Sequence, residues 1–243
     1  MEYFVFDTVE AASKKAYEIM KAHIKADSTL GLATGSSPVA LYKEMIADHK
    51  AGNFSYQDIT TFNLDEYVNI DKNHPESYYS FMHNNLFNHI DINEEKVHIP
   101  APYTNDDAEL AKIVEGYNNE LEAASVDVQI LGVGSNGHIA FNEPGTAFDS
   151  TVHIVDLKEN TIKDNSRFFD FDMEKVPKRA MTMGIKNILK AKNIIFLAFG
   201  ANKRDAVAKL LAGKEDINYP CTSLINHPNV FVIVDKAADP TAE

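Results

Sequence analysis

Polar side chains that could move protons follow two apolar, β-branched segments of the chain. Asp65 comes directly after residues 59–64, and His138 lies in the glycine-rich segment 132–145, which continues the apolar run 128–133. A partly desolvated carboxylate at the end of a buried strand can act as a general base toward a carbon next to a carbonyl or imine. An imidazole changes its charge near neutral pH and can shuttle a proton. These residues predict acid–base chemistry.

The neighbouring acid Glu66 does not share the role of Asp65 in this interpretation. Adjacent side chains point in different directions along an extended chain, so the two carboxylates reach different surroundings. A structural alternative stays open for Asp65, because an aspartate after a strand also caps the next turn through its own side chain.

His138 is flanked by Asn136 and Glu143, and a nearby carboxylate can fix the tautomer of an imidazole and raise its basicity. The segment matches the pattern G-x-G-x-x-G, but Pro144 and Gly145 follow where a dinucleotide site requires a helix. We therefore expect no dinucleotide cofactor. Neither a cysteine nor a second histidine lies at metal-ligand spacing from His138, so we expect no metal.

An anion site is predicted where another apolar segment ends in four small or polar residues before Pro38. They are Thr34, Gly35, Ser36 and Ser37. Backbone N–H groups and hydroxyls that converge at the start of a helix suit a phosphate. The loop lacks the Gly-Lys-Ser/Thr ending of a nucleotide-binding P-loop, and an ordinary helix cap is the alternative.

Two cations complete the candidate site. Arg167 offers a bidentate fork to a phosphate, and Lys203, just after the apolar segment 193–199, offers a point charge. Taken singly, each could be an ordinary surface charge. Together with the loop 34–37, they predict a clamp on one phosphate.

Apolar segments that read as buried strands alternate with segments of helical periodicity. An N-terminal strand is followed by predicted strands at 29–33, 59–64, 128–133, 193–199 and 230–234. The predicted helices are 8–24, 38–47, 77–90, 106–124, 178–189 and 203–211.

This alternation predicts an α/β fold: a Rossmann-like, doubly wound, mostly parallel sheet with helices on both faces. The length of 243 residues suits one domain over 1–243. The segment from about 145 to 178 is polar, weakly periodic and studded with aromatic residues, which favours a lid over the site.

Composition excludes several classes of partner. The formal net charge of -13 opposes binding to nucleic acids or anionic membranes, and no apolar run is long enough to span a bilayer. The N-terminus lacks the pattern of a signal peptide, and the single cysteine, Cys221, cannot form an intramolecular disulfide. These features favour a cytoplasmic protein.

Six motifs are spread over nearly the whole length of the chain. In order they are ATGSSP, FNLDEY, SNGHIAFNEPG, NSRFF, VPKRAMTMGIKNIL and FGANK, of which NGHIAFNEP is the most specific. In these motifs the chain resembles the glucosamine-6-phosphate deaminase family. The resemblance implies conversion of glucosamine 6-phosphate and water to fructose 6-phosphate and ammonia, without metal or redox cofactor. The implied partner is this small sugar phosphate.

The resemblance also implies a role for each motif residue. His138 opens the sugar ring with Glu143 orienting it, and Asp65 moves a proton from C2 to C1. Arg167, Lys203 and the loop around Gly35–Ser37 resemble the phosphate contacts of the family.

Two departures from the family pattern stand out. Asn136 replaces the aspartate of many members, and an amide cannot stabilise an imidazolium by charge. The regulated hexameric members carry basic side chains where this chain has His153 and Val155, and they have a longer C-terminal tail. The resemblance therefore implies a short form, compatible with a monomer, without an allosteric activator.

Two other families are alternative interpretations of this sequence. The 6-phosphogluconolactonases share the architecture, but they resemble the pattern D-G-H-T-A-S-L-F-P where this chain reads NGHIAFNEPG. The sugar-phosphate-sensing domains of transcription regulators are joined to a helix-turn-helix, and no basic N-terminal extension is present here. The joint presence of Asp65, His138 and Glu143 favours an enzyme over a sensing domain or a catalytically inactive binding protein.

Overall fold

Seven parallel strands form the central sheet of the computed structural model, which describes residues 1–241 and, apart from Asn160 and Asp164, their side chains. The strand order is β1-β10-β9-β6-β2-β3-β5, and every pair of neighbours is parallel. The strands are β1 Glu2–Phe6, β2 Thr29–Leu32, β3 Thr60–Asn63, β5 Val97–His98, β6 Val128–Gly132, β9 Asn193–Ala198 and β10 Val230–Asp235. The predicted doubly wound parallel sheet is confirmed.

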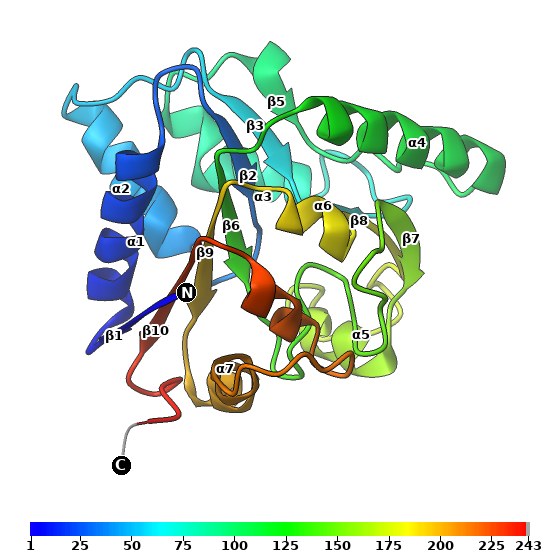
Figure 1. Ribbon diagram of the computed structural model, residues 1–243. Coiled ribbons are helices and arrows are strands. Elements are labelled where there is room, and N and C mark those ends of the chain that lie inside the picture. Colours follow the sequence, from blue (N-terminus) through cyan, green and yellow to red (C-terminus); the bar gives the residue numbers. More distant parts are fainter. Residues whose placement is uncertain (242–243) are drawn as a thin grey trace.

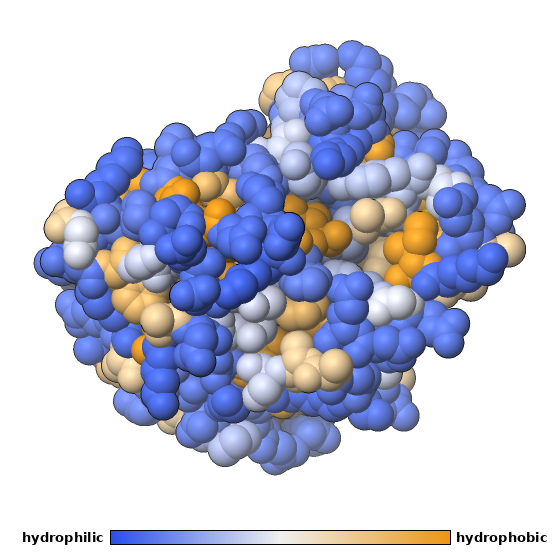
Figure 2. Space-filling model, turned by 90° about the horizontal axis from the view of Figure 1, so that it is seen from above, coloured by the Kyte–Doolittle hydropathy of each residue, from blue (hydrophilic) through white to orange (hydrophobic). Residues whose placement is uncertain are grey.

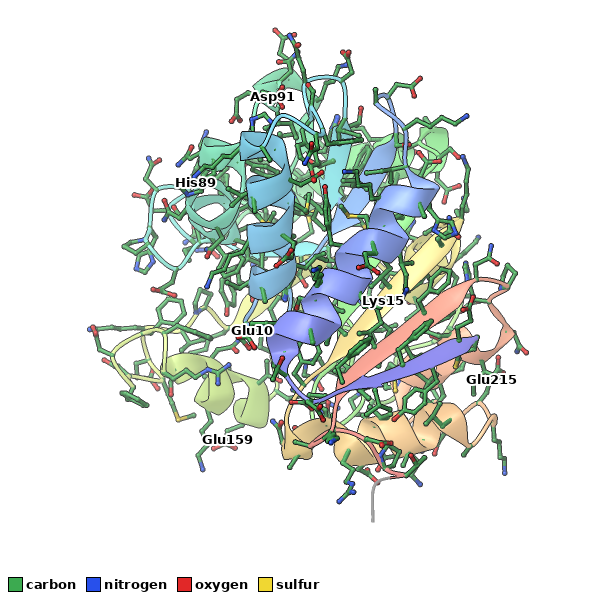
Figure 3. All side chains as sticks on the ribbon, turned by 90° about the vertical axis from the view of Figure 1, so that its left-hand side faces the viewer. Glu10, Lys15, His89, Asp91, Glu159 and Glu215 are labelled. Carbon is green, nitrogen blue, oxygen red and sulfur yellow. The ribbon has the colours of Figure 1, made fainter. Side chains whose placement is uncertain are left out.

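Helices cover both faces of this sheet, with α1 and α2 on one side and α4 on the other (Figure 1). Figure 3 looks onto the face that α1 and α2 cover, where Glu10 and Lys15 of α1 point outward. The helices are α1 Val9–His23, α2 Val39–Lys50, α3 Tyr78–Asn85, α4 Asp107–Ala123, α5 Glu159–Ser166, α6 Ile185–Leu189 and α7 Arg204–Leu211.

The helix boundaries follow from local chemistry. The side chain of Thr8 accepts a hydrogen bond from the N–H of Ala11 at the start of α1, and Asp106 does the same for Glu109 in α4. These caps satisfy N–H groups that have no partner within the helix. Buried residues of α1 recur at helical spacing, including Ala12, Ala16 and Met20, so one face packs on the sheet while the other faces water.

A second sheet of three antiparallel strands lies beyond the end of β3. Its order is β4 (Asp65–Tyr67), β8 (Arg179–Thr182) and β7 (His153–Asp156). The predicted helix over 178–189 is therefore wrong in its first half, because only Ile185–Leu189 is helical. Residues 179–182 pair with strands that are more than 20 positions away along the chain, and such tertiary pairing overrides local helix propensity.

The loops that leave β9, β6, β2 and β3 meet at one edge, because these four strands are consecutive neighbours in the sheet. The order of the strands also reverses between β2 and β6, since β2 is followed by β3 toward one edge of the sheet and β6 is followed by β9 toward the other. In open α/β sheets, ligands bind at the carboxyl ends of the strands around such a switch point. The fold therefore brings the predicted site residues of four loops to a common edge.

The surface is mostly hydrophilic in the view from above, with apolar residues in small groups among polar ones (Figure 2). This view shows the end of the molecule that lies away from α5 and α7. Of the helices within residues 1–241, none combines the length and apolar character that crossing a membrane requires.

Candidate active site

Asp65 is the first residue of β4, directly after the chain leaves the central sheet through β3. Only 6% of its surface is exposed. Burial, and secondly the negative charge of Glu66, raise the pKa of Asp65 from 3.8 to about 8. A carboxyl group with a pKa near the working pH can both take up and release a proton, as a general base for carbon acids must. Among the described residues, no hydrogen bond to the Asp65 side chain contributes to this pKa shift, so the structure offers no support for the alternative that Asp65 caps the next turn.

Glu66 faces a different environment, as the sequence predicted. Its carboxylate accepts hydrogen bonds from the backbone N–H groups of Tyr67, Tyr78 and Tyr79, and the last two are the first residues of α3. Burial raises the pKa of Glu66 to about 7, while these three hydrogen bonds oppose the rise. Because hydrogen bonds from N–H groups favour the charged form, Glu66 ionises first and its charge helps to keep Asp65 protonated.

Four tyrosines around Asp65 were not predicted from the sequence. Burial raises the pKa of each hydroxyl, and the charge of Asp65 raises it further. These residues are Tyr42 of α2, Tyr67 of β4, Tyr78 of α3 and Tyr117 of α4. Tyr67 ends the motif FNLDEY, whereas Tyr42, Tyr78 and Tyr117 come from three other elements and no local motif links them to Asp65.

The structure joins the three predicted residues of the glycine-rich segment in one chain of contacts. Nδ1 of His138 lies 2.6 Å from Oδ1 of Asn136, and Nδ2 of Asn136 donates to Glu143 at 2.9 Å. An amide oxygen only accepts, so Nδ1 donates this hydrogen bond, and in the neutral imidazole Nε2 then keeps its lone pair. Oε1 of Glu143 is 3.9 Å from Nδ1, so Glu143 orients His138 through Asn136 rather than by a direct hydrogen bond.

Two glycines give this loop its shape. A side-chain carbon at Gly134 would overlap the imidazole of His138, which therefore lies directly against the backbone. Gly137 has φ +82°, a conformation that favours glycine. The N–H of Gly134 donates to the carbonyl of His138 at 2.9 Å, which closes the turn beneath the imidazole.

The predicted phosphate loop links β2 to α2. Gly35 has φ +88°. Ser37 lies close to Gly132 at the end of β6, because a Cβ atom added to Gly132 would be 3.8 Å from the Cβ of Ser37. Lys203 ends the 3-10 helix η3 (Ala201–Lys203), directly before α7. The loop, Lys203 and the His138 segment thus leave neighbouring strands, β2, β9 and β6.

Arg167 occupies a different position from the other predicted phosphate ligands. It is exposed at the end of α5, and its guanidinium lies 4.6 Å from the ring centroid of Phe168. Among the described residues, no hydrogen bond or ion pair joins Arg167 to the loop 34–37. A clamp on phosphate that includes Arg167 therefore stays a prediction.

The segment from 145 to 178 contacts Glu143 and Tyr67, which are neighbours of the two acid–base residues, through α5. The hydroxyl of Thr161 donates to Glu143, and Nδ2 of Asn165 donates to the hydroxyl of Tyr67 at 2.8 Å. Phe169 is buried 6.0 Å from the Tyr67 ring, measured between centroids, and Phe171 is 81% exposed. Among the side chains that the structure describes, no group of three or more from His, Cys, Asp or Glu could hold a metal ion.

Sequence comparison finds close relatives of this chain. Residues 6–232 match the family model described as glucosamine-6-phosphate isomerases/6-phosphogluconolactonase. A glucosamine-6-phosphate deaminase of Lysinibacillus sphaericus is 46% identical over 236 residues, which are 96% of this chain and 98% of the relative. The glucosamine-6-phosphate deaminase of Thermoanaerobacter pseudethanolicus is 44% identical over 241 residues, which are 98% of this chain and 94% of the relative.

Structural comparison separates two groups of neighbours. A protein described as a monomeric glucosamine-6-phosphate deaminase superposes with a TM-score of 0.93 at 40% identity, covering 98% of both chains. The 6-phosphogluconolactonase of Trypanosoma brucei superposes with a TM-score of 0.80 at 21% identity, covering 98% of this chain and 97% of the neighbour. At that lower identity the likeness concerns the fold alone.

Proposed function

Because the chain belongs to the family of glucosamine-6-phosphate isomerases and 6-phosphogluconolactonases, we propose that it is a glucosamine-6-phosphate deaminase. It converts glucosamine 6-phosphate and water to fructose 6-phosphate and ammonia. The observation that carries this choice is the likeness over 98% of the chain, at 40% identity, to a protein described as a deaminase, against 21% for the lactonase.

His138 performs ring opening in this mechanism. Its Nε2 lone pair takes the proton of the anomeric hydroxyl, and the imidazolium returns a proton to the ring oxygen, which gives the open-chain aldehyde. The hydrogen bond from Nδ1 to Asn136 supports this tautomer. Glu143 supplies the negative charge that the amide of Asn136 lacks, at 3.9 Å from Nδ1.

Asp65 performs the isomerisation. Its carboxylate removes the proton from C2 while one proton of the substrate ammonium group passes to O1, which leaves an enolamine. The carboxyl group then returns the proton to C1, which leaves the nitrogen as a protonated imine. The product is an imine at C2, which water hydrolyses to the ketone and ammonia. A buried carboxylate with a raised pKa is a stronger base than an exposed one, which supports this assignment.

The phosphate group binds where Thr34, Gly35, Ser36 and Ser37 precede α2. Lys203 supplies a positive charge from the loop after β9, which is two strands away from β2 in the sheet. Backbone N–H groups at a helix start and one cation suit a dianion. Residues 145–178 form a lid that places Arg167 over the substrate within one domain spanning 1–243. The contacts of Thr161 and Asn165 with the site support this role.

The enzyme acts as a monomer in the cytoplasm in this proposal. The structural relative at 40% identity is described as monomeric. The sole cysteine, Cys221, is buried, and burial raises the pKa of its thiol to about 12, which suits a protein that needs no disulfide.

The decisive experiment measures ammonia release from glucosamine 6-phosphate by the purified protein, coupled to detection of fructose 6-phosphate. Hydrolysis of 6-phosphogluconolactone is assayed in parallel. We expect ammonia and ketose in equal amounts and no acceleration of lactone hydrolysis. Lactone hydrolysis without ammonia would assign the chain to the other branch of its family.

A further inference from the structure

A surface turn far along the chain holds the loop that carries His138 at both ends. We call residues 134–145 the catalytic loop and residues 216–221 the clamp turn. The N–H of Cys221 donates to the carbonyl of Gly137 at 2.8 Å, and the N–H of Gly145 donates to the carbonyl of Ile217, also at 2.8 Å. The two segments are separated by more than 70 residues, so nothing in the local sequence predicts this arrangement.

Tyr219 stands at the centre of the clamp turn and lies against the catalytic loop. A side-chain carbon at Gly137 would be 2.8 Å from Cδ1 of Tyr219 and 3.2 Å from its Cα. The two residues are therefore in close van der Waals contact, with no room for a larger residue at Gly137. The Tyr219 ring therefore packs against Gly137, the residue before His138, and supports it from one side.

The Tyr219 ring is itself held in place from α7. Its hydroxyl donates to Asp205 at 2.6 Å, and Nζ of Lys209 lies 5.0 Å from the ring centroid. Asp205 is two residues after Lys203, which we assign to the phosphate group. The ring thus connects the catalytic loop to the start of the helix that follows the phosphate ligand.

A shift of Gly137 would be passed on to His138 through short contacts. The N–H of Gly137 donates to the carbonyl of Gly134 at 3.0 Å, and the N–H of Gly134 donates to the carbonyl of His138 at 2.9 Å. The imidazole packs directly on Gly134. This turn is too tight to absorb a displacement at one of its residues without moving the others.

We propose that Tyr219 is a positioning residue that sets the place of His138 relative to the phosphate site by supporting Gly137 and bonding to Asp205. The proposal rests on the proposed deaminase function for its kinetic consequences. Its structural consequence, a changed environment of His138 when the ring is removed, does not depend on any activity.

The kinetic test compares Tyr219→Ala and Tyr219→Phe with the exposed Lys214→Ala as a control on the neighbouring surface. Misplacing a catalytic group by about 1 Å can cost about 100-fold in rate, so we expect kcat of Tyr219→Ala to fall by roughly 10- to 100-fold. KM should stay within about 2-fold, since the phosphate contacts are unaltered. Tyr219→Phe keeps the ring against Gly137 but loses the hydrogen bond to Asp205, so we expect a smaller loss of about 3-fold, and Lys214→Ala should match the wild type.

A second measurement follows the imidazole of His138 directly by ¹H–¹⁵N NMR, with its signals identified by their loss in His138→Gln. We expect these signals to shift in Tyr219→Ala and to stay in place in Lys214→Ala. Unchanged His138 signals, or an unchanged kcat in an active wild-type background, would overturn the proposal. If the wild-type protein releases no ammonia, the function fails, and the NMR comparison still decides whether Tyr219 positions His138.

Discussion

Adjacent carboxylates in β4 do different work because their surroundings differ. Glu66 accepts three backbone hydrogen bonds and fixes the start of α3, whereas burial and the charge of Glu66 raise the pKa of Asp65 to about 8. Asp65 is therefore the candidate base, and the charge of Glu66 raises the pKa of that base. Of these two carboxylates, only Asp65 exchanges a proton with the substrate in the proposed mechanism.

Asp65→Asn should abolish most turnover while substrate binding is retained, because an amide cannot accept the C2 proton. General-base catalysis contributes roughly 100- to 10,000-fold, and we expect a loss of kcat in this range. The measurement is ammonia release under saturating substrate, with binding followed by calorimetry. Turnover at the wild-type rate would remove Asp65 from the mechanism.

The same variant should also change how stability depends on pH. The pKa of Asp65 is raised on folding, so the folded state favours its protonated form and loses stability as pH rises from 3.8 through about 8. Asp65→Asn lacks this ionisation. The free energy of unfolding of Asp65→Asn minus that of the wild type, both measured in urea, should therefore increase as pH rises through this window. A difference that does not change with pH would contradict the raised pKa of Asp65.

Glu66→Gln should move the pH–activity profile of the enzyme. The base must be ionised, so kcat/KM of the wild type should fall tenfold per pH unit below about pH 8. Removing the Glu66 charge lowers the pKa of Asp65, so this limb of the profile should shift to lower pH. An unshifted limb in the folded variant would show that the charge of Glu66 does not tune the base.

At the scale of structural elements, glycines in the loops at the carboxyl ends of the strands determine where neighbouring side chains can lie. Gly134 provides the space in which the imidazole of His138 lies, and Gly137 adopts φ +82° against Tyr219. The sequence marks this loop as glycine-rich, but it does not say which glycine accommodates which neighbour. Contact with a segment beyond residue 200 decides that.

Gly134→Ala should push the imidazole out of its position, because the added carbon would overlap the ring. We expect kcat to drop by roughly 100-fold while the protein stays folded, as thermal unfolding would check. Gly116→Ala is the matched control: it lies within α4 with nothing near the added carbon, and should stabilise by about 1 kcal/mol without loss of activity. Full activity of Gly134→Ala would show that the imidazole can act from another place.

At the scale of the whole molecule, β7 occupies the place where regulated relatives are expected to carry basic side chains. Nδ1 of His153 contacts the carbonyl of Thr151 at 2.7 Å, and Val155 pairs with Ala180 of β8. Neither residue presents a permanent positive charge to an anionic effector. This supports an enzyme whose activity depends on substrate alone.

N-acetylglucosamine 6-phosphate should therefore leave the KM for glucosamine 6-phosphate unchanged apart from weak competition at the active site. Initial rates over a range of substrate, with and without this compound, measure the effect. Sedimentation velocity under the same conditions should give the mass of a monomer. A several-fold decrease in KM, or sigmoidal kinetics, would show that a regulatory site exists elsewhere in the chain.

The sequence by itself determined the parallel sheet, most helix positions and the chemical types at the site. Buried strands in a parallel sheet are uninterrupted apolar runs, and helices carry caps and periodic faces, so both leave local signals. The motif around His138 also carried the family assignment, which the comparisons confirm. These features depend on residues that are near one another along the chain.

Only the tertiary structure decided the small sheet, the tyrosines around Asp65 and the support of the catalytic loop by Tyr219. Residues 179–182 are strand rather than helix because β4 and β7 offer them hydrogen-bonding partners. Asp65 acquires its raised pKa because distant elements exclude water from it. Pairing, desolvation and packing are created by residues far apart in the chain, and no local pattern encodes them.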